Sequence, residues 1–145
     1  MILDERTEFV DAVAVPLTAN ANVLLGDVVD LGGAVNVGSG DYCDFYVSVD
    51  TTITGATSVE FKLMSDAQAA IDPATGTRHG STGAIPVARL TAGAIFGFQL
   101  PKGFDYERYL GLVVTVVGTA TAGKINSGLA AEIGGWRAIA SETGY

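Results

Sequence analysis

The chain has 145 residues, the usual size of one domain, and 48% of them are hydrophobic, which argues against a disordered protein. Charged residues make up only 17%, against about 25% in ordinary domains, and 19 glycines predict many tight turns. The formal net charge is −8 with eight Lys and Arg residues, which argues against partners such as nucleic acid and anionic membranes.

The N-terminal segment carries acidic residues where a secretory signal would carry basic ones, so we expect synthesis in the cytoplasm. We expect residues 1–20 to form an extended arm that contacts a partner, because the segment is terminal and mixes apolar with charged side chains. Its candidate contact residues are Leu3, Asp4, Glu5, Arg6 and Phe9.

Two alternating strands are predicted in the first half of the chain, after a short strand candidate at Val23–Leu31 and a glycine-rich loop at Gly32–Asp41. The strands are Cys43–Thr52 and Thr57–Met64, which we expect to pair around a turn at Gly55. In the second strand, Val59, Phe61 and Leu63 should face inward, and Ser58, Glu60 and Lys62 outward.

A short helical turn near residues 65–71 is predicted from the order Ser65 to Gln68, which is typical of a capping box. Pro73 should end this turn, because proline disfavours helix in the residue before it. The polar residues from Pro73 to Gly83 then predict a projecting loop.

The second half of the chain again predicts strands, first at Ile85–Leu90 and Ala94–Leu100. The β-branched run Tyr109–Thr119 and the run Lys124–Ile133 should form a hairpin around the turn Gly118–Gly123.

With a last short strand at Trp136–Ile139, the chain has about seven or eight strands and no long helix. We therefore predict one all-β domain over residues 1–145, an antiparallel two-sheet sandwich that is jelly-roll-like.

Few residues have the pattern of a reactive site. His79 is the single histidine and lies in a polar loop, where an exposed side chain is expected, and no serine is its obvious partner. Asp44 should raise the pKa of Cys43, which favours a buried or half-buried structural thiol over a nucleophile. Asp27 and Asp30 are interpreted as turn residues. We therefore expect no enzyme activity, no cofactor and no metal.

Aromatic and arginine side chains near two of the predicted strands are candidates for an interface, because Tyr, Trp and Arg are enriched at interface centres. They are Tyr106, Arg108 and Trp136. Two alternatives stay open: Trp136 caps the core, or exposed aromatic rings bind a sugar, as in a carbohydrate-binding sandwich module. A metal-dependent jelly-roll enzyme is disfavoured, since it needs several histidines.

Five stretches of the sequence resemble small capsid cement (decoration) proteins of tailed bacteriophages. They are MILDERTEFVDAVAVP at the start, Gly26–Gly32, Phe61–Ile71, Ala84–Leu90 and Glu107–Gly118. The resemblance implies a jelly-roll-like fold and a homotrimer on the outer capsid surface of the virion. It also implies the major capsid protein of the phage head as partner, with the trimer stabilising contacts between its subunits.

Overall fold

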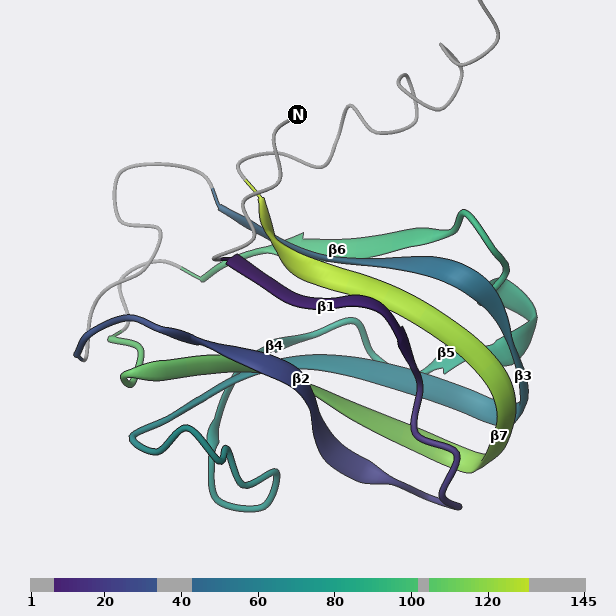
Figure 1. The fold of residues 1–145 in the computed structure, drawn as a ribbon, viewed down its shortest axis with the longest axis horizontal. Coiled ribbons are helices and arrows are strands. Elements are labelled where there is room, and N and C mark those ends of the chain that lie inside the picture. The colour runs from purple at the N-terminus through teal and green to yellow at the C-terminus, as the bar shows by residue number, and fades with distance from the viewer. Residues whose placement is uncertain (1–6, 34–42, 102–104, 131–145) are drawn as a thin grey trace, which may run out of the picture.

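Two long strands form the centre of the computed structural model, which describes residues 7–33, 43–101 and 105–130 (Figure 1). Strand β3 runs over Asp44–Asp66 and β7 over Tyr109–Ala130. They pair antiparallel along almost their whole length, from Asp44 opposite Ala130 to Asp66 opposite Tyr109. Both strands bend near their middle, so that one sheet folds over into two layers (Figure 1).

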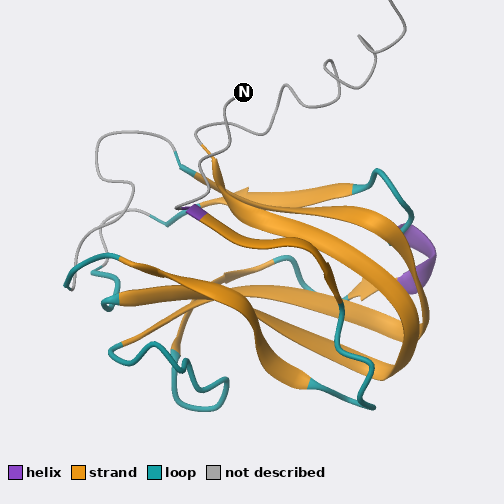
Figure 2. Cartoon of the chain, in the orientation of Figure 1, coloured by secondary structure: helices purple, strands orange, loops and turns teal. Residues whose placement is uncertain are grey.

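Each half of the β3–β7 pair is hydrogen-bonded to further strands, and together they form one layer of the sandwich (Figure 2). In one layer, β1 (Glu8–Ala14) flanks the C-terminal half of β7 and β6 (Ile95–Gln99) flanks the N-terminal half of β3. In the other layer, β2 (Asn22–Asp30) flanks the N-terminal half of β7. The C-terminal half of β3 there pairs with β4 (Thr77–Ser81) and with β5 (Ile85–Pro86).

The predicted all-β antiparallel sandwich is therefore confirmed, with seven strands in the described residues. The two predicted hairpins are wrong, because the chain passes through both supposed turns as continuous strand. Gly55 and Gly118 have φ angles of 88° and 86°, and register shifts between Val49 and Ser58 absorb the bend. Both glycines lie at bulges, which let the two strands curve together. The β-branched residues next to the bulges keep the strands paired.

The predicted helical turn near residues 65–71 is also wrong. Ser65 still belongs to β3, and the four residues after Asp66 form bends. Its hydroxyl does not cap a helix, since it bonds the His79 ring and the Glu107 amide instead. A 3-10 turn, η2 (Val87–Arg89), divides the expected strand Ile85–Leu90. In the described ranges, no helix is long and apolar enough to cross a membrane.

The expected N-terminal arm is in part a strand. Residues 8–14 form β1, because their apolar side chains complete the core; Phe9 is only 2% exposed. The predicted strand Trp136–Ile139 lies outside the described residues.

The core lies between the two layers and is built from the inward-facing side chains of β3 and β7. Val59, Phe61 and Leu63 are fully buried, as the alternation predicted. The same interior holds further buried side chains, among them Phe9, Phe45, Leu112, Val114 and Ile125. A second, smaller cluster lies on the outer face of the β2 layer and consists of Met64, Ile71 and Val113.

Glycines allow close contact where the two layers meet on either side of the folded sheet. Gly26 in β2 lies against the backbone of Phe9 in β1, and a Cβ there would overlap the Phe9 carbonyl oxygen and the Val10 side chain. On the other side, a Cβ at Gly80 in β4 would overlap the ring of Phe98 in β6. The layers approach each other this closely because these two positions carry no side chain.

We predict that Gly26→Ala destabilises the protein much more than Gly32→Ala does. Both glycines have φ angles near +78° (77° and 79°), so both variants carry similar backbone strain. Of these two positions, only position 26 has a Cβ that meets other atoms of the described residues, and such overpacking costs about 1–3 kcal/mol. Urea unfolding should show this difference in free energy; equal losses would mean that the contact between the layers does not require a glycine.

Candidate interaction surface

The outer face of the β2 layer carries a row of polar side chains that crosses four strands. We call it the polar row; it consists of Asn22 on β2, Thr115 on β7, Glu60 and Lys62 on β3, and Arg78 on β4. Glu60 and Lys62 face outward because they alternate with the buried Val59, Phe61 and Leu63, as predicted.

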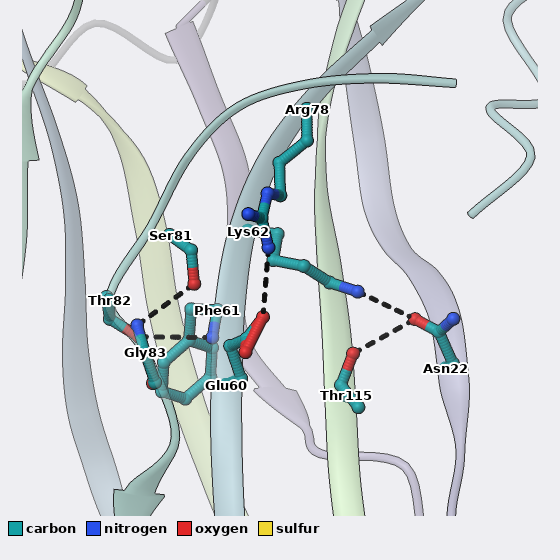
Figure 3. A network of polar contacts seen from close by, with 9 residues as sticks. All are labelled: Asn22, Glu60, Phe61, Lys62, Arg78, Ser81, Thr82, Gly83 and Thr115. Carbon is teal, nitrogen blue, oxygen red and sulfur yellow. Dashed lines mark hydrogen bonds and ion pairs between the residues drawn. The ribbon is translucent and has the colours of Figure 1, made fainter. Parts of the chain in front are cut away.

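Hydrogen bonds join Asn22, Lys62 and Thr115 across three strands, and an ion pair joins Glu60 to Arg78 (Figure 3). The Asn22 side-chain oxygen accepts one hydrogen bond from Lys62 Nζ at 3.1 Å and one from the Thr115 hydroxyl at 3.0 Å. Arg78 Nη1 lies 3.9 Å from Glu60 Oε1, and the Arg78 side chain is 61% exposed. Ion pairs of this exposure contribute little to stability, so these groups are free to exchange partners at an interface.

The chain after β3 covers the remaining part of this outer face. Ile71 reaches back onto Met64 and Val113, and Leu24 and Val28 of β2 pack against the same cluster. A turn fixes the segment, with the Thr75 and Gly76 amides donating to the Asp72 carbonyl. The polar row therefore lies at the surface, half-buried to exposed, next to an apolar area that is already covered.

Arg108, an interface candidate from the sequence, makes a two-pronged ion pair with Asp30. Its Nε and Nη2 atoms each lie 2.9 Å from one carboxylate oxygen, and its guanidinium lies over the Tyr109 ring. The Gly32 amide donates to the same carboxylate, as the turn interpretation of Asp30 predicted. The Arg108 hydrogen bond and then the Gly32 amide lower the pKa of Asp30 to about 2.

Two other interface candidates are core residues. Phe9 and Tyr106 are buried in the main core, so their side chains do not face a partner, which corrects the expectation. The neighbouring segments looked exposed in the sequence, but burying both aromatic rings in the core is favourable in free energy. The remaining candidates, Leu3, Asp4, Glu5, Arg6 and Trp136, lie outside the described residues.

His79 is not the exposed loop residue that the sequence predicted. It lies on β4 and is half-buried, and its Nε2 atom is 2.6 Å from the Ser65 hydroxyl. The expectation that no serine partners His79 is therefore wrong. The two residues meet through the antiparallel pairing of β3 with β4, which was not predicted. Ser65 has 0% exposure, so its hydroxyl is closed to solvent.

Cys43 agrees with its prediction as a half-buried thiol. Burial, and then the neighbouring Asp44 carboxylate, raise its pKa, which disfavours the nucleophilic thiolate. Within residues 7–33, 43–101 and 105–130, no three His, Cys, Asp or Glu side chains converge to hold a metal ion.

We predict that Arg108→Gln raises the pKa of Asp30 from about 2 most of the way to the ordinary value of 3.8. The Gly32 amide remains in place and accounts for the part that does not return. Carboxyl carbon chemical shifts followed by NMR between pH 1.5 and 6 measure this change. Arg78→Gln is the matched control and should leave the Asp30 titration unchanged; a shift of similar size in that variant would contradict a specific pair.

No curated protein matches the chain. A family model with the description Bbp16 matches residues 9–129, which extend from Phe9 in β1 to Leu129 in β7 and overlap every strand described here. The match covers most of the chain and both layers of the sandwich, and the chain therefore belongs to the Bbp16 family.

Proposed function

We propose that this protein is a structural virion protein, a capsid cement protein that binds the outer surface of a phage head. In this proposal it acts as a homotrimer and stabilises contacts between major capsid subunits. The resemblance of five sequence stretches to phage cement proteins supports it. Three of these stretches, Gly26–Gly32, Phe61–Ile71 and Glu107–Gly118, lie mainly in the layer that carries the polar row.

The observation that carries the proposal is the polar row itself. It crosses four paired strands, and it offers amide, hydroxyl, carboxylate and cationic groups at one surface (Figure 3). Such groups fix the orientation of a bound protein more than they supply its affinity. The paired strands beneath them fix the backbone from which these groups project, so no backbone ordering adds to the entropy cost of binding.

Binding of this kind would stabilise a capsid by mass action. A protein that binds only the assembled shell shifts the equilibrium toward that shell by RT ln(1 + [L]/Kd) per site, about 2.7 kcal/mol at one hundred times Kd. In a trimer the second and third contacts become intramolecular, so modest single contacts suffice. The net charge of −8 favours a neutral or basic partner surface.

Carbohydrate binding, the other function considered, requires exposed aromatic rings. Tyr46 and Tyr106 are buried and Tyr109 is half-buried, so the tyrosines in the described ranges do not favour it.

We predict a solution mass three times the 14.9 kDa chain mass. A trimer is expected because a capsid site of three-fold symmetry offers three identical contacts, one for each copy of the chain. Light scattering coupled to size-exclusion chromatography measures the mass directly. A monomer or a dimer over the whole micromolar range would contradict the trimer and require another arrangement on the capsid.

We predict that the double variant Lys62→Ala/Arg78→Ala binds phage heads at least about tenfold more weakly, which is about 1.4 kcal/mol. Binding is measured by co-sedimentation with heads that lack the protein, and head stability by the temperature at which they release DNA. Both side chains lie at the surface, so folding should change by less than about 0.5 kcal/mol per site.

The matched control is Arg89→Ala/Lys124→Ala, which removes the same charge at exposed positions away from the polar row. It should bind heads within about threefold of the unchanged protein. Equal weakening in both double variants would indicate a general charge effect. Unchanged binding in the first double variant would remove the polar row from the interface.

A further inference from the structure

The single histidine of the chain ties together three segments that are far apart in the sequence. His79 on β4 contacts the Ser65 hydroxyl on β3 and stacks on the Tyr106 ring, which precedes β7. The ring centroids of His79 and Tyr106 are 3.9 Å apart, and the planes differ by 15°. The Tyr106 hydroxyl donates in turn to the Pro101 carbonyl at 2.9 Å. We call this group the histidine clasp: Ser65, His79, Tyr106 and Glu107.

The hydrogen bonds of the clasp determine which nitrogen of His79 carries a proton. The Ser65 oxygen accepts a bond from the Glu107 amide, 3.2 Å away. In the described ranges, the acceptor found for its hydroxyl proton is His79 Nε2, 2.6 Å away. We therefore assign this contact as the Ser65 hydroxyl donating to Nε2, which places the proton of the neutral ring on Nδ1.

Protonation of His79 breaks this arrangement. Once Nε2 carries a proton, it donates to the Ser65 oxygen, and the Ser65 hydroxyl proton loses its acceptor. Ser65 has 0% exposure, so water does not replace the lost acceptor. A buried hydroxyl without a partner and a cation in a half-buried site both disfavour the closed state.

We propose that the histidine clasp is an acid-sensitive device that releases the segment before β7 from the β3–β4 hairpin when His79 becomes charged. Release separates the Glu107 amide from Ser65 and the Tyr106 ring from the imidazole. The main β3–β7 pairing stays in place, because the clasp lies at its end, where Asp66 meets Tyr109. The opening is therefore local.

The other titratable groups around the clasp act in both directions. The Glu107 carboxylate favours the charged imidazole, but the Thr77 hydroxyl already donates to it at 2.6 Å. Two other titratable groups lie near the clasp, the Tyr106 phenol and, next to it, the Cys43 thiol. The Arg78 guanidinium pairs with Glu60 on the outer face. Burial outweighs the Glu107 carboxylate, so the pKa of His79 lies below 6.5.

The sign of the effect follows from this lowered pKa. The unfolded chain binds the proton more tightly than the folded one, so stability falls as the pH drops below 6.5. Once the pH is below both pKa values of His79, each unit by which the folded pKa lies below the unfolded pKa makes the folding equilibrium about tenfold less favourable.

NMR titration of the full chain between pH 8 and 5 tests the proposal, and one histidine gives one unambiguous imidazole signal. We expect a midpoint below 6.5, with the amide signals of Ser65 and Glu107 shifting at the same midpoint. After correction for the intrinsic dependence of exchange on pH, hydrogen exchange at the Glu107 amide should quicken at least tenfold across this midpoint, while the amide of Val114 within β7 stays protected. A midpoint at or above 6.5, or a Glu107 amide that does not respond, would overturn the device.

His79→Gln provides the matched variant, because its amide oxygen accepts from Ser65 and cannot become charged. Its exchange rate at Glu107, corrected for the intrinsic dependence on pH, should not change between pH 7 and 5.5. Glu107→Gln removes the opposing carboxylate and should move the His79 midpoint further down. A His79→Gln protein with the same acid response as the unchanged chain would assign that response to other groups and refute the proposal.

Discussion

The antiparallel pairing of β3 with β7 is the constraint on which the rest of this structure depends. It runs from Asp44 and Ala130 at one end to Asp66 and Tyr109 at the other, and so passes through both layers. Because both strands bend together, the pairing fixes the position of one layer relative to the other. Every other strand in the described ranges pairs with β3 or β7, so each is positioned by this central pair.

At the two open sides of the folded sheet, the layers meet without a shared strand. Close contact is possible there because Gly26 lets β2 approach the backbone of Phe9, and Gly80 lets β4 approach the Phe98 ring. The inward side chains then fill a closed interior. The outer faces stay available, and the face with the polar row is one of them.

Polar groups in this protein differ in function according to their burial. The Ser127 hydroxyl is fully buried and donates to the Tyr46 carbonyl, which holds neighbouring strands together. The polar row lies at the surface, with Arg78 exposed and Glu60 half-buried, so its ion pair contributes little to stability. The histidine clasp lies between these extremes, since His79 is half-buried and its bond to Ser65 depends on one proton. The proposed binding face and the proposed acid-sensitive clasp thus lie in one small domain.

The sequence alone determined the fold class and the two faces of the strands, because alternation of apolar and polar residues has the period of a β-strand: Phe61 and Leu63 are buried and Lys62 is not. It predicted turns at Gly55 and Gly118, because glycine permits a turn and a bulge equally well. Only the tertiary structure decided between them, since the choice depends on the partner strand across the bend. The same reason applies to Ser65 and His79, whose contact depends on strand register and not on any local pattern.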